Sequence, residues 1–573
     1  SAPNAMMLRL STRSGDVIEP VIKPQWYVRC GEICARMAEV VSSGELQLLP
    51  EPEQRKWQAW MAAPRDWCIS RQLWWGHQIP AYRVRGVSGE EEWVVGRSAE
   101  EAERRARERF PDAELSLERD EDVLDTWFSS ALLPFSDFGW PEDTPDLRAF
   151  FPNQLLETGS DILFFWVARM VMLSLLLTDK LPFRTVFLHS IVRDEQGEKM
   201  SKSRGNVIDP LELIDGCELE TLVAKLQESA LPEKEKKSAI AARRRLFPQG
   251  IPRCGADALR FALLGQVADR DINLAVSEVV AMRKFCNKIW NSFYLVATLL
   301  PPGAQPDPRG SGSPADAWLC RKLHNCVAKV NADCEGYRFG AAVERLRGFW
   351  LALCDNYLEY VKSPAAQGHA LLFHTLETFL RLLHPFMPFL TEELYQKLPA
   401  FPAKHLSISI APYPTADGPA PRGHELFACL LRLIAAANSN GAAGGSLAAA
   451  AEPALAAFLQ DNAAFITRMT RARQFQLCSA EAFPPRAVLC AVIPALTLAV
   501  SSAETPPQEL LFRLQREAKQ LRTLIADLEA KSGKADYRAK ARPEALARAD
   551  EKLAAYRAEL LSKEASLQAL QPR

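Results

Sequence analysis

A change of pattern near residue 275 constrains the fold of this chain more than any other feature. From about residue 123 to 275, apolar strand-like runs alternate with stretches of helical periodicity, which is typical of an α/β parallel sheet. Beyond it, apolar side chains recur at helical spacing with few strand signals, in residues 278–297, 315–335, 338–362 and 367–398. We therefore expect a parallel-sheet region followed by an all-helical bundle.

The last part of the chain carries a different helical signature. Apolar residues alternate between spacings of three and four in two runs, 511–528 and 546–570, with one polar exception at Lys563. A segment with Gly533 and Pro543 separates the runs, so the heptads predict an antiparallel coiled-coil hairpin. The expected tip of this hairpin is basic, with Lys531, Lys534, Arg538, Lys540 and Arg542. These charges are either a solvated turn or a finger that contacts phosphates.

Composition limits the classes of function. The chain has 573 residues, which is material for roughly three or four domains. Its 69 basic and 70 acidic residues give a net charge of -1, so an anionic partner must be met by local basic patches. The thirteen cysteines include no C-x-x-C pair, so we expect no metal site and a reducing compartment. We expect neither a secretory signal nor a membrane span.

Two lysines mark the clearest candidate for chemistry. Lys199 and Lys202 belong to the run K-M-S-K-S, which follows the strand-like residues 185–192 and precedes Gly205-Asn206. Lysine is a compact charge with three donors on a flexible stem, so a pair of lysines in a loop can follow a triphosphate and stabilise a leaving pyrophosphate. The alternative is a solvated basic turn.

The lysine run resembles the second ATP motif of the class I aminoacyl-tRNA synthetases. It has His189 and residues 194–197 before it and the residues 205–210, G-N-V-I-D-P, after it. Residues 66–80 resemble the point where the chain of the family returns from the editing insertion to the nucleotide-binding fold. Four other parts are similar to the valine enzymes of that family: residues 125–130 and 158–166, the start of an anticodon-binding helical domain at 285–291, and a tRNA-binding arm in the terminal heptads.

The chain also departs from the family pattern. The eight histidines, at 77, 189, 324, 369, 374, 384, 405 and 424, never form the His-x-Gly-His of the first ATP motif. Of the editing domain, only an exit segment at residues 13–20 is recognisable. The resemblance therefore implies an incomplete Rossmann-like catalytic portion that lacks the first half of its sheet.

The resemblance implies five parts along the chain. They are the exit of the editing insertion (1–45), the second half of the Rossmann-like catalytic domain (46–275), a helical anticodon-binding domain (276–415), a small variable linker region (416–504) and a coiled-coil tRNA-binding arm (505–573).

The resemblance also assigns a nucleotide site. Its cofactor would be ATP, with Mg2+, and Lys199 and Lys202 would be catalytic, because they hold the triphosphate and the departing pyrophosphate. The residues expected to bind ATP are Gly159, Asp161, His189, Lys199, Met200, Ser201, Lys202 and Ser203. Asp161 would accept from the ribose hydroxyls, although an aspartate there would equally cap a helix. His189 would donate to ATP or be a structural histidine.

The amino-acid site is expected to be apolar. Ile162 and Trp166 are four residues apart on a helical stretch, so they would share one face, and with Trp127 they would wall a cavity sized for valine. The alternative is an ordinary core. The tryptophans at 57, 60, 67, 74 and 75 are either a stacking platform for the tRNA end or, as we expect, packing around a strand.

The resemblance implies a valine–tRNA ligase, which makes valyl-adenylate from valine and ATP and transfers valine to tRNA(Val). The alternative is a catalytically incomplete tRNA-binding module, and a third hypothesis, a coiled-coil scaffold, explains only the terminal heptads. The expected partners are tRNA(Val) and valine, with no membrane. We expect a monomer, alone or in a larger translation complex, in the cytoplasm or alternatively in the mitochondrion.

Overall fold

The computed structural model describes residues 9–11, 15–86, 92–111, 114–200, 205–267, 271–362, 369–402, 404–479, 482–484, 487–493, 496–501, 507–532 and 543–570. Packing divides the chain into two compact units. The first consists of residues 1–200 and 267–273, and the second of residues 201–266 and 274–573.

The first unit is built on a parallel sheet of three strands, as the alternating pattern predicted. Its strands, in spatial order, are β2 (Gln47–Leu49), β10 (Phe183–His189) and β9 (Asn153–Gly159). In β10, the residues Phe183, Val186 and Leu188 are buried. The register pairs His189 with Gly159, so the carboxyl ends of β9 and β10 meet at one edge of the sheet.

Helices pack on this sheet through apolar stripes. They are α1 (Gly31–Ser42), α2 (Pro52–Met61) and α7 (Ala168–Thr178), which is preceded by the 3-10 turn η1 (Ser160–Ile162) and the π-helical turn η2 (Leu163–Val167). The buried face of α1 repeats at helical spacing, with Ile33, Met37 and Val40 in the same core cluster as Met170 and Val186 of α7 and β10. The apolar spacing of residues 31–42 predicts a helix from the sequence, and α1 confirms it.

Smaller elements complete the first unit. The charged residues 97–119 predict a helix that Pro111 interrupts. The structure has the helix α3 (Ala99–Arg109), which ends before Pro111 and packs on a three-stranded antiparallel sheet. The strands of that sheet are β6 (Glu92–Val95), β5 (Ala81–Arg85) and β7 (Ser116–Arg119). Three strand pairs follow: β1 (Tyr27–Val28) with β3 (Trp67–Cys68), β4 (Ser70–Arg71) with β8 (Val123–Leu124), and β11 (Val192–Arg193) with β12 (Ile272–Asn273). The short helices are α4 (Thr126–Ser130), α5 (Leu133–Ser136) and α6 (Pro145–Phe150).

One helical stretch is long and apolar enough to be compared with a membrane span. Residues Ser160–Thr178 have a mean hydropathy of 1.8, and half of the window is buried inside the protein. Its middle, from Met170 to Leu173, belongs to the core of the first unit. A core helix passes such a test of length and composition, so the finding is weak support for a membrane segment.

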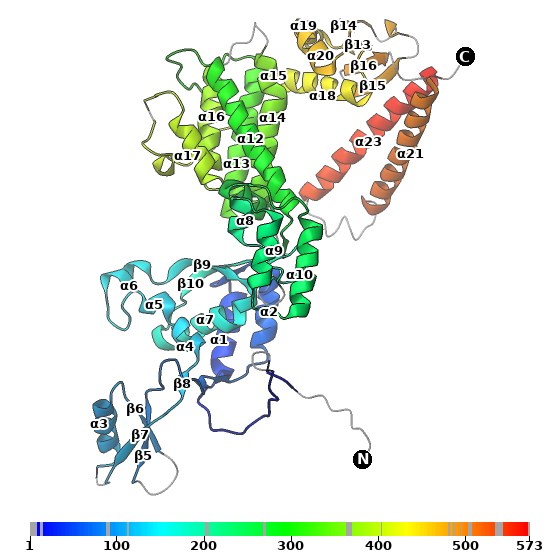
Figure 1. Ribbon diagram of the computed structural model, residues 1–573. Helices are drawn as coiled ribbons and strands as arrows, with labels where there is room; N and C mark the ends of the chain where they lie inside the picture. Colours follow the sequence, from blue (N-terminus) through cyan, green and yellow to red (C-terminus); the bar gives the residue numbers. More distant parts are fainter. Residues whose placement is uncertain are drawn as a thin grey trace, which may run out of the picture. The chain divides into compact units, whose positions relative to one another are not determined.

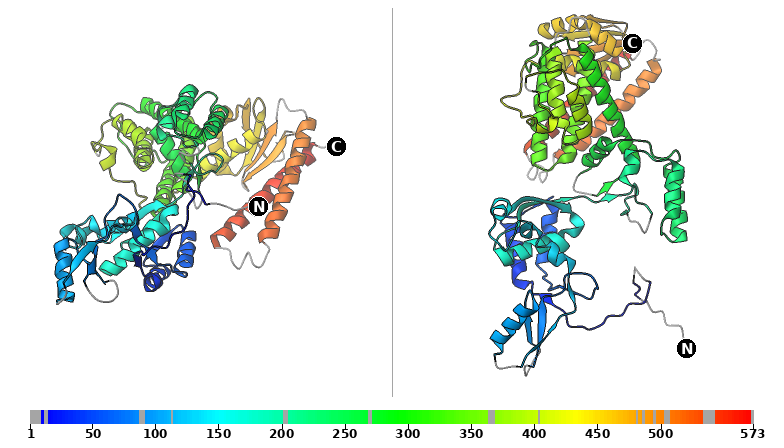
Figure 2. Two further views of the ribbon diagram at one scale, coloured as in Figure 1. Left: turned by 60° about the horizontal axis from the view of Figure 1, so that its bottom comes forward. Right: turned by 60° about the vertical axis from the view of Figure 1, so that its left-hand side comes forward.

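The second unit contains the predicted helical bundle. Its main helices are α12 (Val276–Leu299), α13 (Pro314–Glu335), α14 (Phe339–Ala352), the π-helical turn η4 (Leu353–Tyr357), α15 (Leu358–Val361), α16 (His369–Leu383) and α17 (Pro388–Gln396), followed by the 3-10 turn η5 (Ile408–Ile410). Figures 1 and 2 show α12, α13, α14 and α16 lying side by side. The stretch 367–398, expected as one helix, is two, because Pro385 and Pro388 interrupt it.

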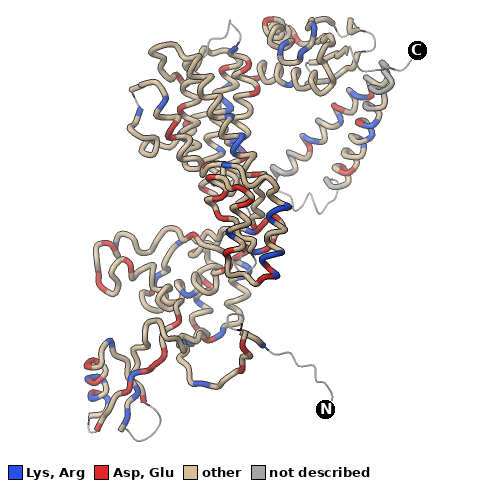
Figure 3. The backbone as a smooth tube through the Cα atoms, in the orientation of Figure 1, with Lys and Arg blue, Asp and Glu red and all other residues tan. Residues whose placement is uncertain are grey.

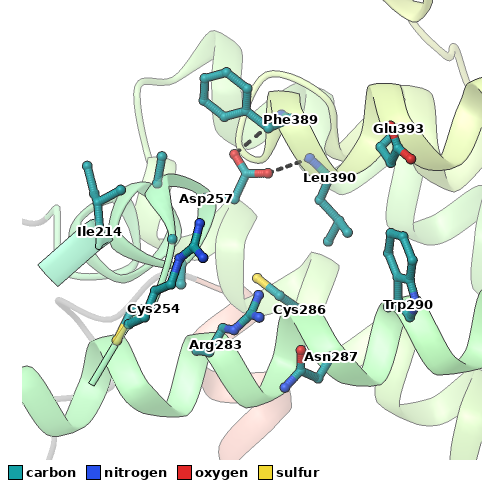
Figure 4. Close-up of a pocket in the computed structure, with 14 residues that line it drawn as sticks. Ile214, Cys254, Asp257, Arg283, Cys286, Asn287, Trp290, Phe389, Leu390 and Glu393 are labelled. Carbon is teal, nitrogen blue, oxygen red and sulfur yellow. Dashed lines mark hydrogen bonds between the residues drawn. The ribbon is translucent and has the colours of Figure 1, made fainter. Parts of the chain in front are cut away.

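Four helices before the bundle pack with it rather than with the parallel sheet. They are α8 (Pro210–Ile214), α9 (Leu219–Glu228), α10 (Glu233–Leu246) and α11 (Ala256–Gly265). Asp257 of α11 is buried and accepts from the backbone N–H groups of Phe389 (3.4 Å) and Leu390 (2.6 Å) at the start of α17. Figure 4 shows these bonds beside a cavity of about 610 Å³. Burial raises the pKa of the Asp257 carboxyl more than the two bonds lower it.

Residues 416–504, which the sequence predicted as a linker region, contain a four-stranded sheet. Its strands, in spatial order, are β14 (Gln474–Leu477), β13 (Ser446–Ala451), β16 (Leu496–Ser501) and β15 (Val488–Ile493). The helices of this part are α18 (Glu425–Ser439), α19 (Pro453–Asp461) and α20 (Ala463–Thr470). Residues 487–493 and 496–501 are strand-like in the sequence, and β15 and β16 confirm this prediction, whereas the sequence did not predict β13 and β14.

Two long helices end the described chain, α21 (Pro507–Ser532) and α23 (Pro543–Leu570). Ion pairs Arg522–Glu564 and Arg557–Glu529, both 2.7 Å, join them in antiparallel order. Acidic and basic residues are interspersed along both helices (Figure 3). The polar exception in the heptads, Lys563, lies 2.9 Å from Glu517 and 3.3 Å from the side-chain oxygen of Asn440. Supercoiling of the pair remains a prediction.

Candidate functional site

Polar side chains gather where β9 and β10 end. Gly159 and His189 are opposite each other in the parallel register. A Cβ atom on Gly159 would lie 2.8 Å from Oδ1 of Asp161 and 3.1 Å from Ile191. The glycine is therefore needed for space, since its φ of -71° suits any residue. The carboxyl ends of parallel strands are where open α/β sheets bind ligands.

The first lysine of the predicted ATP motif reaches this edge. Lys199 Nζ lies 3.5 Å from Oδ2 of Asp161, and both side chains are about half exposed, at 63% and 47%. A bridge between Arg193 and Lys199 closes a turn in which the carboxylate of Asp194 accepts from the N–H of Glu198 at 2.8 Å. The turn brings Lys199 back toward the strand ends.

His189 is held by groups of the same strands. Its Nε2 lies 3.4 Å from Oε1 of Glu157 on β9, and its Nδ1 lies 3.0 Å from the carbonyl oxygen of Ser190. The Nδ1 contact requires the proton on Nδ1, because a carbonyl oxygen only accepts. Four of the predicted ATP residues, Gly159, Asp161, His189 and Lys199, therefore lie together.

A second ion pair fixes the base of the lysine turn. Arg193 on β11 pairs with Asp271, whose carboxylate also accepts from the N–H of Ile191 at 3.2 Å. The bond from Arg193 is the main reason that the pKa of the Asp271 carboxyl is lowered. Because Asp271 and Ile191 are 80 positions apart in the chain, no local sequence signal could have found this support.

The remaining part of the predicted ATP motif is only partly described. Met200 is the last described residue before the gap, and it is half-buried. Ser201, Lys202 and Ser203 lie outside the described residues. Their predicted roles stay predictions.

The aromatic residues of the predicted valine pocket are neighbours in the structure. Trp127 stacks near Phe165, with ring centroids 6.4 Å apart, and the indole N–H of Trp166 donates to the carbonyl of Ser130 at 3.0 Å. Both tryptophans are partly buried against the main core. Ile162 ends a 3-10 turn and Trp166 lies in a π-helical turn, so the shared α-helical face expected for this pair does not apply.

A buried carboxylate anchors the turn that carries Trp127. Asp125 is 6% exposed and accepts from the indole N–H of Trp67 at 3.0 Å, and Arg71 lies 3.1 Å from the same oxygen. The guanidinium of Arg169 covers the ring of Trp67 at 4.4 Å. Burial lowers the pKa of Arg169. Asp125 was missed as a supporting residue, although it opens the D-T-W-F-S-S motif.

The five tryptophans of residues 57–75 divide into two groups. Trp57 and Trp67 are buried, and Trp60 stacks on Phe164 with centroids 5.0 Å apart. These three pack in the core, as expected. Trp74 and Trp75 are fully or almost fully exposed, at 105% and 93%, so packing within the described residues does not account for them.

The predicted tRNA-binding tip lies outside the described side chains. Lys531 belongs to the end of α21, but its side chain is not described, and Lys534, Arg538, Lys540 and Arg542 fall in the gap between α21 and α23. Among the residues that the structure describes, no group of three or more His, Cys, Asp or Glu side chains is placed to hold a metal ion.

Two segments of the chain match known protein families. Residues 4–275 match the family model of class I tRNA synthetases for isoleucine, leucine, methionine and valine, and residues 316–442 match the anticodon-binding domain of tRNA ligases. Residues 4–275 therefore carry the domain of the class I tRNA synthetase family, and residues 316–442 carry the anticodon-binding domain of tRNA ligases. The strand-end cluster lies within the first matched segment, and helices α14 to α17 of the bundle lie within the second.

Within that family, the chain is about 50% identical to valine–tRNA ligases. It is 51% identical over 429 residues to the mitochondrial valine–tRNA ligases of Mus musculus and Homo sapiens, which covers 72% of this chain and 40% of each relative. It is 49% identical over 439 residues to a valine–tRNA ligase of Rattus norvegicus, covering 72% of this chain and 35% of that protein. The chain thus spans 35–40% of the length of these relatives.

Among solved structures, a methionyl-tRNA synthetase of Mycobacterium tuberculosis in complex with methionyl-adenylate gives a TM-score of 0.47 at 19% identity. The match covers 72% of this chain and 71% of that one. This likeness is too weak to add to the family assignment.

Proposed function

We propose that this chain carries the activity of a valine–tRNA ligase, in which ATP activates valine and the valyl group passes to tRNA(Val). The observation that carries the proposal is the cluster of Gly159, Asp161, His189 and Lys199 at the carboxyl ends of β9 and β10. The identity of about 50% to valine–tRNA ligases over 72% of the chain supports it.

In the proposed reaction, a carboxylate oxygen of valine attacks the α-phosphorus of ATP. The bond to the bridging oxygen breaks, pyrophosphate leaves with the electron pair, and valyl-adenylate remains. Positioning and charge stabilisation dominate such phosphoryl chemistry. Lys199, with Lys202, would stabilise the triphosphate and the leaving pyrophosphate, and Asp161 would accept from the ribose hydroxyls once Lys199 moves onto the phosphates.

The other substrates have proposed positions as well. Trp127, Ile162 and Trp166 would contact the side chain of valine, and His189 would donate to ATP. The terminal ribose of tRNA(Val) then attacks the carbonyl of valyl-adenylate and releases AMP. The basic tip with Lys531, Lys534, Arg538, Lys540 and Arg542 would contact tRNA phosphates. Mg2+ would arrive on the triphosphate.

The assembly and compartment belong to the same proposal. The protein would be a monomer that works alone or within a translation complex. It would act in the cytoplasm or in the mitochondrion, since some relatives are named as mitochondrial and others are not.

A second function, tRNA binding without activation, is favoured by one sequence feature. None of the eight histidines forms the His-x-Gly-His of the family's first ATP motif. A chain without that second set of phosphate donors would keep the anticodon-binding domain and bind tRNA, but it would activate valine poorly.

Valine-dependent exchange of pyrophosphate into ATP separates the two functions, because this exchange needs no tRNA. We expect the purified 573-residue chain to exchange with valine and not with lysine or without amino acid. A folded chain that binds tRNA(Val) but gives no exchange above background would contradict the ligase and leave the binding module.

A further inference from the structure

A cavity of about 420 Å³ opens in the second unit, between helices α13, α14 and α18. Trp318, Arg321, Lys322 and Asn325 line it from α13 at the spacing of one helical face, and Arg432 lines it from α18. Helices α13 and α18 pack on each other. The cavity is thus formed by the bundle and the small α/β part together.

The charge of this cavity is one-sided. Arg321, Lys322 and Arg432 line it, and no carboxylate does. In the described part of the chain, none of these three side chains takes part in an ion pair of 4.0 Å or less; Arg321 donates to the carbonyl of Pro421 at 3.0 Å, and Lys322 lies 5.6 Å from the ring centre of Trp318. His424 also lines the cavity, and its Nδ1 lies 3.2 Å from the carboxylate of Glu425, so that carboxylate stands beside the histidine. In a chain with a net charge of -1, the three cations that have no ion pair among the described residues mark a place for an anion.

Neutral donors accompany the three cations. The amides of Asn325 and Asn356 face the cavity, and Asn356 lies in the π-helical turn η4, where one amide N–H donates to the carbonyl of Ala352 at 3.0 Å. π-helical turns occur often at functional sites. An amide has two N–H donors and one acceptor, so the second N–H and the oxygen of Asn356 remain for a phosphate or a ribose hydroxyl.

We infer that this cavity binds consecutive phosphates of an RNA strand, which rests on the proposed function because it takes tRNA as the partner. The cations stand on two different helices, which suits an extended polyanion better than a single ion. Arginine binds phosphate oxygens through two parallel N–H bonds, and lysine adds a compact charge. Every lining residue falls within residues 316–442, which match the anticodon-binding domain.

The test compares variants of the whole chain for binding to labelled tRNA(Val) at salt concentrations from about 50 to 200 mM. The affinity for a nucleic acid falls with salt by about 0.7–0.9 logarithmic unit per logarithmic unit of salt for each phosphate contact. We expect Lys322→Gln with Arg432→Gln to lower this slope by about 1.4–1.8 and the affinity at 100 mM salt by about tenfold.

Two controls keep the result interpretable. Arg65→Gln with Lys180→Gln also removes two positive charges, but from exposed positions in the first unit, and should leave the salt slope unchanged. Lys322→Arg with Arg432→Lys keeps the charges and should retain most of the binding. An unchanged thermal unfolding midpoint shows that the cavity variant is folded.

Two outcomes would overturn the inference in different ways. A wild-type chain that binds tRNA(Val), with a cavity variant of equal affinity and equal slope, removes the cavity from the interface and leaves the proposed function intact. A wild-type chain that binds no tRNA(Val) contradicts the proposed function and the cavity assignment together.

Discussion

The strand-end site of the first unit and the cationic cavity of the second unit handle charge in opposite ways. At the strand ends, three described basic groups face carboxylates: Lys199 faces Asp161, His189 faces Glu157, and Arg193 faces Asp271. In the cavity, Arg321, Lys322 and Arg432 form no ion pair with any residue that the structure describes. Under the proposed function, the nucleotide site would rest with its charges paired between substrates, whereas the cavity proposed to take a polyanion would keep its positive charges unpaired.

The largest effect is expected from Lys199, which would leave Asp161 for the phosphates. Lys199→Ala should lower valine-dependent ATP–pyrophosphate exchange by about 10²–10³, the usual loss when one donor to developing charge is removed. This loss is measured by comparing the exchange rates of the variant and of the unaltered chain at saturating ATP. The control is Lys180→Ala, which removes an exposed lysine of the same unit and should change the exchange rate less than about twofold. An equal loss of exchange in both variants would contradict the special role of Lys199.

Asp161 should affect binding of the nucleotide more than the chemical step. A hydrogen bond to a charged group contributes about 1.5–3 kcal/mol, so Asp161→Ala should raise the KM for ATP by about 10–100-fold. The sharper measurement compares ATP with 2′-deoxyATP and 3′-deoxyATP. The unaltered chain should discriminate against at least one of the deoxy nucleotides, and the variant should not. Discrimination that survives in the variant would assign the ribose to another residue.

Substitution of Asp125 tests the support of the aromatic residues near the predicted valine pocket. Its carboxylate holds Trp67 and Arg71, and its side chain is 8% exposed while that of Arg71 is 37% exposed. Asp125→Asn leaves a partly buried cation without its charge partner, which we expect to cost about 1–2 kcal/mol. The thermal midpoint of the first unit should fall by several degrees, whereas Asp143→Asn, in an exposed pair with Arg148, should leave it almost unchanged.

The smallest effect concerns acid stability. The hydrogen bond from Arg193 lowers the pKa of Asp271 in the folded chain, so its contribution to stability is complete above the ordinary pKa of 3.8 and is lost as the pH falls through the lowered value. Because both side chains are about one-third exposed, the effect is modest. Acid unfolding of the unaltered chain and of Asp271→Asn should converge at low pH and differ at neutral pH. Curves that stay parallel throughout would contradict this.

The sequence predicted the periodic parts of the molecule well. The helices of the bundle and α1 follow apolar stripes, and those stripes are buried. The sequence predicted secondary structure less well where neighbouring strands determine the conformation of a segment. The alanine-rich β13 reads as helical, but β14 and β16 hold it in a sheet, because the context of neighbouring strands outweighs intrinsic preference. The 3-10 and π-helical turns at 160–167 also gave no sequence signal.

The residues of the candidate site also divide into those with a local sequence signal and those that depend on distant partners. Gly159, Asp161, His189 and Lys199 could be predicted because they belong to short motifs that resemble a family. Asp271 could not, because it meets Ile191 and Arg193 only through the pairing of β11 with β12. The cationic cavity was missed for a related reason: its charges come from two helices, and Lys322 of α13 is about 110 positions from Arg432 of α18.

The most direct test of the separate functions of these two regions measures valine activation and tRNA binding in one variant of each region. Exchange of pyrophosphate with valine and the salt dependence of tRNA(Val) binding are measured for Lys199→Ala and for Lys322→Gln with Arg432→Gln. We expect a crossed result, in which the first variant loses exchange and keeps its binding slope, and the second keeps exchange and loses slope. If exchange and slope fell together in either variant, the two regions would not have the separate functions that their charges indicate.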